Sequence, residues 1–193
     1  MQTQRQRELI EAAIHLTATE GIQKLTIRNV AAAIGVSEAA VYRHFESKHA
    51  LLQAILEHLN TLLAPRFMLL LKQTDTPLAA LKIFLDDLFS LLEHNAAFTL
   101  MLFAEETFNV DAELRPELMG LLEGNLSHLS SFYASIMEKG LCRTDLRPEQ
   151  LALITFGTIR LTVSRWHLQK NENSLHAQLD ALCNSLQTLF ELQ

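Results

Sequence analysis

The stretch that most restricts how this chain can fold covers residues 26–48, TIRNVAAAIGVSEAAVYRHFESK. Thr26 can cap a short helix, because its hydroxyl oxygen can accept a hydrogen bond from an otherwise unpaired amide of the first turn. Apolar residues then recur at helical spacing, and Gly35 follows them where a helix end often needs a positive φ. Ser37 can cap a second helix. The pattern predicts two short helices joined by a tight turn.

The second of these helices would bury Val41 and Phe45 and turn its other side chains outward. In a helix-turn-helix, the second helix enters the major groove of DNA. The two alanines allow close approach to a surface, and the polar residues supply groups suited to phosphate oxygens and base edges. The outward face carries Glu38, Ala39, Ala40, Tyr42, Arg43 and His44. Lys48 lies just beyond, near the first turn of the next helix, where it and the free amides would hold a phosphate.

These residues carry a family resemblance. The segment GVSEAAVYRHFESKHALL resembles the recognition segment of the TetR/AcrR family of bacterial transcriptional regulators. The segments RQRELIEAAIHLTATEG and TIRNVAAAIG resemble the rest of that DNA-binding domain. The matching motifs cover about the first quarter of the chain, and the remainder agrees in length and helical pattern. The resemblance implies a DNA-binding domain over residues 1–47 and a helical effector-binding and dimerisation domain over residues 48–193.

The resemblance also implies how the DNA contacts are shared out. Thr26, Tyr42, His44 and Lys48 would hold phosphates, and Ser37 completes the expected set. Contacts to bases or groove edges are expected from Arg28, Ala39, Ala40 and Arg43, since the position of Arg28 sometimes reads a base in the family. Glu38 departs from the pattern, because it is an acid facing a phosphate-rich groove. Two interpretations stay open: it reads cytosine N4, or it mainly rejects wrong sites.

The net charge of −6 does not at first suggest a nucleic-acid partner. It is unevenly placed, however, because residues 1–60 hold six basic and six acidic side chains and the acidic excess lies beyond them. A neutral head can bind DNA when its bases share one face, and a dimer doubles the contacts. An ordinary solvated surface is the alternative. It is less favoured because Arg28, Arg43 and Lys48 occupy motif positions.

Hydrophobic periodicity predicts an all-α protein of about nine helices, and we see no strands. Gly21 and Gly140 are expected to end helices, and Pro148 to begin one. Pro65 lies inside the long fourth helix and should kink or interrupt it. Beyond the two short helices, the expected ranges are 4–20, 47–72, 76–93, 96–108, 111–140, 148–166 and 174–192.

Apolar and aromatic side chains of the body are candidates for an effector pocket. Methionine and aromatic side chains suit adaptable apolar binding, but at these spacings they are more often simply core. An inward glutamate would favour a cationic compound, although a solvated acid at a helix end is the preferred interpretation of Glu105. The candidates are Met68, Phe84, Phe98, Met101, Glu105, Phe132, Tyr133, Phe156 and Trp166.

The helix near residues 151–166 is apolar on nearly every face. Such a helix must be covered on all sides, so we expect a second subunit to cover what the core does not. Two terminal helices pairing with their symmetry mates would form a four-helix bundle, as the resemblance also implies. The expected dimer interface comprises Leu153, Phe156, Ile159, Leu161, Val163, Leu179, Leu182 and Leu186.

Other classes of protein are poorly supported. The chain has no glycine-rich phosphate loop, nucleophile elbow or HExxH pair, so we expect no enzyme and no cofactor. His44 and His49 do not share a helix face well, so no metal site is expected. Cys142 and Cys183 form neither metal spacing nor a disulfide framework, which favours reduced thiols in a cytosol. No apolar signal core or eighteen-residue uncharged apolar run is present, so we expect a cytoplasmic protein without membrane contact.

We therefore expect a homodimeric transcriptional regulator that binds a pseudo-palindromic duplex operator. A repressor released by a small apolar or cationic effector is the favoured form. The alternative keeps the DNA-binding head but uses the body to bind a protein partner, as a nucleoid-occlusion factor does. The third and least favoured interpretation is a small all-α enzyme or carrier with an incidental helix-turn-helix.

Overall fold

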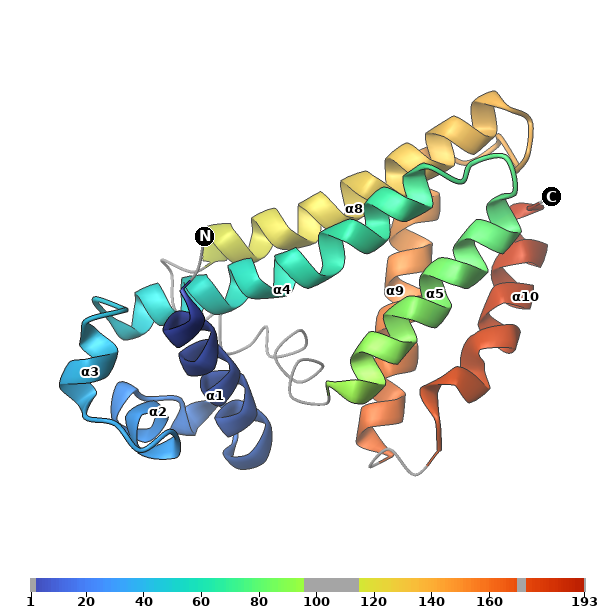
Figure 1. Ribbon diagram of the computed structural model, residues 1–193. Helices are drawn as coiled ribbons and strands as arrows, with labels where there is room; N and C mark the ends of the chain where they lie inside the picture. Colours follow the sequence, from blue (N-terminus) through green and yellow to red (C-terminus); the bar gives the residue numbers. More distant parts are fainter. Residues whose placement is uncertain (1–2, 96–114, 170–172, 193) are drawn as a thin grey trace. The chain divides into compact units, whose positions relative to one another are not determined.

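The computed structural model describes residues 3–95, 115–169 and 173–192, and these ranges contain helices and no strands (Figure 1). The all-α fold class predicted from the sequence is therefore confirmed. The helix predicted over residues 96–108 lies outside the described residues. So do three of the predicted pocket residues, Phe98, Met101 and Glu105.

The described helices follow the predicted order closely. The sequence signals at Gly21, Ser37 and Pro148 each mark a helix end in the structure. The elements are α1 (Gln4–Glu20), η1 (Ile22–Lys24), α2 (Ile27–Ala33), α3 (Glu38–Tyr42), α4 (Lys48–Leu71), α5 (Pro77–His94), α8 (Arg115–Glu138), α9 (Pro148–Leu168), η2 (Leu175–Gln178) and α10 (Leu179–Phe190).

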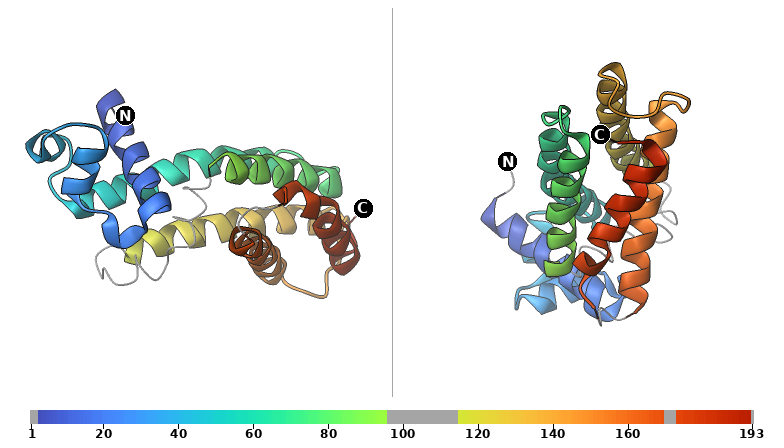
Figure 2. Two further views of the ribbon diagram at one scale, coloured as in Figure 1. Left: turned by 90° about the horizontal axis from the view of Figure 1, so that it is seen from below. Right: turned by 90° about the vertical axis from the view of Figure 1, so that its right-hand side faces the viewer.

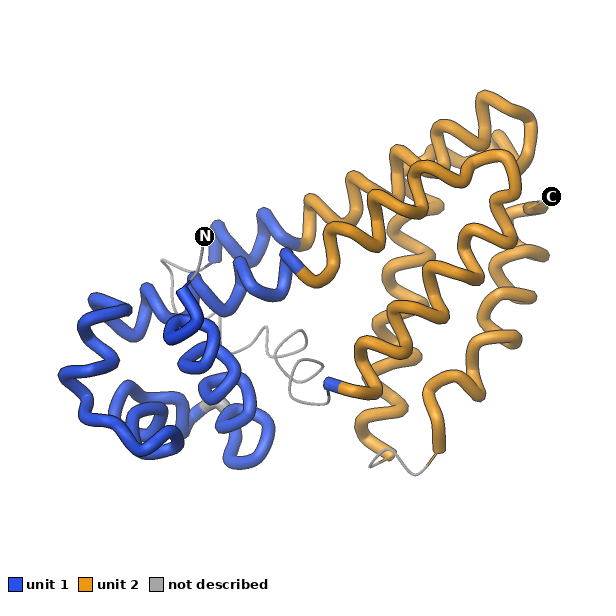
Figure 3. Tube along the Cα trace, viewed as in Figure 1, with its two compact units in different colours: residues 1–61, 95–121 blue, residues 62–94, 122–193 orange. Residues whose placement is uncertain are grey.

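The chain divides into two compact units (Figure 3). The first comprises residues 1–61 and 95–121, and the second comprises residues 62–94 and 122–193. Helices α4 and α8 each contribute residues to both units. The expected sequence division after residue 47 remains a prediction.

In the first unit, α1 begins with a capping box. The Thr3 hydroxyl accepts a hydrogen bond from the Gln6 amide at 3.2 Å, and the Thr3 amide donates to the Gln6 side chain at 2.9 Å. Both bonds satisfy amides that a helix start leaves unpaired. The buried face of α1 carries Leu9, Ile10 and Ala13, and it packs against α2.

In the second unit, α5 presents a continuous buried stripe to its neighbours. Leu81, Leu85 and Phe89 are fully buried, and η2 and α10 lie along α5 (Figure 2). Tyr133 of α8 meets Phe190 of α10 edge to face, with ring centroids 5.5 Å apart. These contacts join α5, α8 and α10 around one apolar core.

Two expectations need correction. The last helix was predicted as one element over residues 174–192, but it starts with the 3₁₀ turn η2 before α10 begins at Leu179. Pro65 was expected to kink or interrupt α4; it does not interrupt the helix, which runs on to Leu71, and the kink remains a prediction.

Among the described helices, α4 has the length and mean hydropathy of a membrane span. That is weak evidence for a membrane, because core helices meet the same criterion. Leu51, Ile55, Leu59 and Leu63 of α4 are buried inside the protein.

Candidate nucleic-acid interface

The turn between α2 and α3 is built by a glycine and a serine. Gly35 has φ +68°, a backbone conformation that residues other than glycine rarely adopt. The Val36 amide then donates to the Ala31 carbonyl at 2.9 Å, which closes the end of α2. The Ser37 hydroxyl accepts a hydrogen bond from the Ala40 amide at 3.2 Å and starts α3. Local sequence signals therefore fix where the recognition helix begins.

Val41 and Phe45 hold α3 against the rest of the first unit. Val41 is fully buried and Phe45 is nearly so. The opposite side of the helix stays accessible, since Glu38, Ala39 and Arg43 are exposed. Tyr42 is 50% exposed, so its ring and its hydroxyl are accessible at this surface.

The remaining residues of the predicted set lie at the ends of this helix and on its neighbours. Ala40 and His44 are half-buried, and Ser37 is exposed. The Gln6 side chain donates a long, 3.5 Å hydrogen bond to the His44 carbonyl. Sequence reasoning missed Gln6, although the Thr3–Gln6 capping-box spacing could have singled it out. This contact connects the start of α1 to the end of α3.

The N-terminus of α2 brings two further predicted residues to the surface. The Thr26 hydroxyl accepts a hydrogen bond from the Asn29 amide at 3.1 Å, as expected for a cap. The Asn29 side chain donates to the Lys24 carbonyl at 2.7 Å and ties the helix to the preceding turn. The Thr26 hydroxyl keeps its own hydrogen, which can be donated to a phosphate oxygen. Arg28, two residues further, is exposed.

The start of α4 has the features of an anion site. The Ser47 hydroxyl accepts the Ala50 amide at 3.0 Å, and Lys48 is exposed as the first helical residue. The N-terminus of a helix and a lysine together favour a phosphate. Within the described ranges, Arg28, Arg43 and Lys48 form no ion pair, so their charges are available to a polyanion. The DNA-contact role of each residue remains a prediction.

Behind the interface, His58 of α4 lies close to α1. Burial lowers the pKa of His58, while Glu11 raises it and Arg7 lowers it further. The net effect lowers the pKa and favours the neutral ring at neutral pH.

The predicted effector-pocket residues that the structure describes differ in how far they are buried. Phe84, Phe132, Tyr133 and Trp166 are buried in the second unit, whereas Met68 is 49% exposed. Phe156 is half-buried. Burial is equally compatible with a core position and a pocket wall, so the pocket remains a prediction.

The predicted dimer residues divide in the same way. One chain by itself already buries most of them: Ile159, Val163, Leu179, Leu182 and Leu186. Leu153 and Leu161 of α9 are 60% and 63% exposed, and Phe156 is half-buried. The α9 surface around these last three residues is therefore the part of the set that a second copy could reach.

Comparison with known proteins agrees with this architecture. A family profile described as bacterial regulatory proteins, tetR family, matches residues 9–55. A second, described as YsiA-like protein, C-terminal region, matches residues 57–188, which is most of the chain.

Individual relatives share part of the sequence or the whole fold. The nucleoid occlusion factor SlmA of Escherichia coli O1:K1 / APEC is 34% identical over 99 residues, covering 51% of this chain and 50% of the relative. The chain thus spans about half the length of the curated relatives it matches. The fatty acid degradation regulator FadR from Bacillus halodurans superposes with a TM-score of 0.85 at 22% identity, covering 96% of each chain.

The transcriptional regulator FadR from Bacillus subtilis, solved in complex with stearoyl-CoA, superposes with a TM-score of 0.81 at 22% identity. The superposition covers 93% of this chain and 96% of that one. At such identities these likenesses establish the fold alone. Together, the two matched profiles and the helix-turn-helix geometry show that this chain belongs to the tetR family of DNA-binding bacterial regulatory proteins.

Proposed function

We propose that this chain is a homodimeric repressor that binds a pseudo-palindromic operator with one α3 helix in each of two major grooves. The observation that carries the proposal is the exposed face of α3, where Arg43 and Tyr42 stand outward beside Lys48. The half-sites would lie about one helical turn of DNA, or a multiple of it, apart. Two copies would double the number of phosphate contacts, which offsets the near-neutral charge of each head.

An effector in the helical body would release the operator. Binding can shift the protein only if the effector prefers the non-binding arrangement over the DNA-binding one. We propose a small apolar or cationic compound, held by residues of the second unit such as Phe84, Phe132 and Trp166. A long acyl chain is the first apolar group to test, in the form of stearoyl-CoA, because Bacillus subtilis FadR was solved in complex with that compound.

The test starts from the purified full chain and sheared genomic DNA of the source organism. Retained fragments are sequenced, and the shared site is resynthesised as a short duplex. The proposal expects an inverted repeat, and it expects stearoyl-CoA or another apolar compound to dissociate the complex in a concentration-dependent way. Retention of fragments that share no site would overturn the operator proposal.

A second candidate keeps the DNA-binding head and replaces the effector with a protein partner. Two observations favour it: the identity with the nucleoid occlusion factor SlmA, and exposed Leu69 and Ile83 beside the Arg66–Asp87 ion pair on α4 and α5. An exposed apolar patch of this kind marks an interaction surface. This candidate predicts many chromosomal sites, insensitivity of the DNA complex to small apolar compounds, and septa forming across nucleoids in cells that lack the protein.

A further inference from the structure

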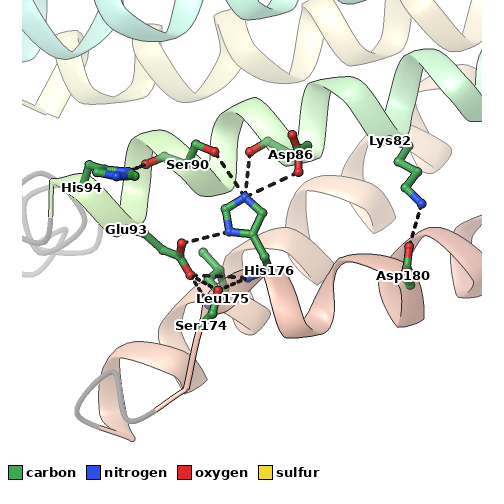
Figure 4. Close-up of polar contacts among 9 residues, drawn as sticks. All are labelled: Lys82, Asp86, Ser90, Glu93, His94, Ser174, Leu175, His176 and Asp180. Carbon is green, nitrogen blue, oxygen red and sulfur yellow. Dashed lines mark hydrogen bonds and ion pairs between the residues drawn. The ribbon is translucent and has the colours of Figure 1, made fainter.

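A polar cluster holds the turn between α9 and α10 on helix α5, within the second unit (Figure 4). We call it the His176 clasp, and it consists of Asp86, Ser90 and Glu93 of α5 with Ser174 and His176 of the turn. The side chains of His176 and Glu93 are 30% and 20% exposed, so water competes only in part with their contacts.

Glu93 acts as a cap supplied by another helix. Its Oε1 atom accepts hydrogen bonds from the Ser174 hydroxyl at 2.7 Å and from the Leu175 amide. Its Oε2 atom lies 2.8 Å from Nδ1 of His176. The carboxylate thereby satisfies the amide end of the 3₁₀ turn η2 and one side of the histidine ring at once.

Oxygen atoms also face the other side of the His176 ring. Nε2 lies 3.2 Å from the Asp86 backbone carbonyl, 3.2 Å from the Ser90 hydroxyl and 3.5 Å from the Asp86 carboxylate. A neutral imidazole carries one N–H and one lone pair, whereas the imidazolium donates from both nitrogens. The Glu93 carboxylate and the Asp86 carbonyl can only accept. Only the doubly protonated ring can therefore donate to Glu93 on one side and to the Asp86 oxygens on the other.

The neutral ring keeps a weaker set of contacts. Ser90 could then donate to Nε2, but the ring would donate nothing to the oxygens of Asp86, and its charge-assisted contacts with the Asp86 and Glu93 carboxylates would weaken. With the proton on Nε2 instead, the Glu93 carboxylate would face a lone pair. Either neutral tautomer therefore lacks one of the bonds from His176 to α5, and the attachment of η2 to α5 becomes weaker.

The surrounding charges define what else could titrate here. On α5, the Lys82 ammonium pairs with Asp180 of α10 at 2.7 Å, and Nδ1 of His94 lies 2.7 Å from the Ser90 carbonyl. The last turn of α9 carries Arg165 and His167. Burial opposes ionisation of Glu93, but hydrogen bonds from Ser174, Leu175 and His176 bring its pKa below the ordinary value. Glu93 thus remains a carboxylate where histidines change charge.

We propose that His176 is a proton-operated clasp, which holds η2 on α5 when the ring is doubly protonated and frees this turn when the ring loses a proton. Histidine side chains ordinarily change charge between about pH 5 and 8, which lies within the range that the experiment below covers. Helix α10 stays docked through buried Leu182, Leu186 and Phe190, which confines the release to the turn before it. The second unit would thereby respond to a change in pH without binding a small molecule.

The chain contains a reporter for this turn. Trp166, its single tryptophan, donates from Nε1 to the Asn173 carbonyl at 2.7 Å, and its indole is mostly buried. Asn173 directly precedes the Ser174 cap, so freeing the turn breaks this hydrogen bond and admits water to the indole. Tryptophan emission then moves to longer wavelength.

The experiment records Trp166 emission of the full chain from pH 5 to pH 9, with circular dichroism to verify that each variant keeps its helix content. The parent should show one step to longer wavelength as the pH rises. His176→Gln and Glu93→Gln should each lack the step, because neither retains the titrating pair. Lys82→Ala removes the neighbouring ion pair and His94→Gln removes the histidine that contacts the Ser90 carbonyl, and both should keep the step. A parent without a step, a step that survives His176→Gln, or a step abolished by His94→Gln would overturn the proposal.

Discussion

The hydroxyl oxygen of Ser37 lies 3.2 Å from the amide nitrogen of Ala40 and accepts its hydrogen bond. This contact caps α3, which has only five residues. A helix so short is not stable by itself and depends on its cap and on the burial of Val41. The geometry of the recognition face is therefore tied to one hydroxyl group.

Replacing this cap should weaken both fold and DNA binding. Ser37→Ala should lower the free energy of unfolding by about 1 kcal/mol, the usual loss when a capping hydroxyl is removed. Urea unfolding followed by circular dichroism measures it, and operator affinity should fall as well. Ser37→Thr keeps the hydroxyl and serves as the control. Equal stability of Ser37→Ala and the parent would show that the cap does not hold α3.

Lys48 and Arg43 should differ in how they contribute to DNA binding. Lys48→Ala should weaken binding to all duplexes and reduce the slope of log K against log salt by about one, because one phosphate contact is lost. Arg43→Ala should instead relax the preference for the operator, by about 1–3 kcal/mol at the base it reads. Fluorescence anisotropy at several salt concentrations measures both. Parent-like binding by both variants would contradict the predicted contacts.

The Tyr133 hydroxyl lies 2.7 Å from the Thr155 hydroxyl, and both side chains are fully buried. Thr155→Val would leave the tyrosine hydroxyl unpaired and should lower the free energy of unfolding by about 1–3 kcal/mol. Tyr133→Phe combined with Thr155→Val should cost less than the sum of the single changes, because no orphaned hydroxyl remains. Urea unfolding of the four proteins completes the cycle. Strict additivity would mean that the two hydroxyls are not coupled.

Tyr133 also predicts a loss of stability in alkali. Burial raises the pKa of Tyr133 far above its ordinary value, and Thr155 lowers it only in part. The unfolded chain loses this proton near pH ~10 and the folded chain does not, so the contribution is complete below that pH and is lost above it. The slope of unfolding free energy against pH above this point should be shallower in Tyr133→Phe than in the parent. Parallel slopes would refute this assignment.

The exposed leucines of α9 should matter for pairing. Leu161 is 63% exposed in one chain, so Leu161→Lys should leave the fold intact but place a charge in the proposed interface and yield monomers. Ile83→Lys is the matched control, because Ile83 of α5 is also exposed at 49%. Sedimentation velocity separates the two states. A dimeric Leu161→Lys protein would place the interface elsewhere.

The sequence revealed the local features of this fold well. Ser37, Gly35 and Pro148 act through backbone bonds within a few residues, so their effects could be predicted without tertiary information. The 3₁₀ start of the last helix could not, because one of its amides, that of Leu175, donates to Glu93, which lies 82 residues away in the chain.

Burial was the second property that sequence patterns left undecided. Val163 and Leu186 resemble interface residues in the sequence, because an apolar side chain does not reveal whether its own chain or a second copy covers it. The structure buries both within one chain and leaves Leu153 and Leu161 exposed. The polar contact of Gln6 with the His44 carbonyl likewise depends on two helices meeting in space.

The central claim is that two copies of α3 read a specific duplex. The most direct measurement is the affinity of the purified chain for its selected inverted repeat and for a scrambled duplex of equal length and composition, at one salt concentration. The account predicts two chains per duplex and a preference for the repeat of at least about 10³-fold. Equal affinity for the two duplexes, or no binding to either even in dilute salt, would contradict it.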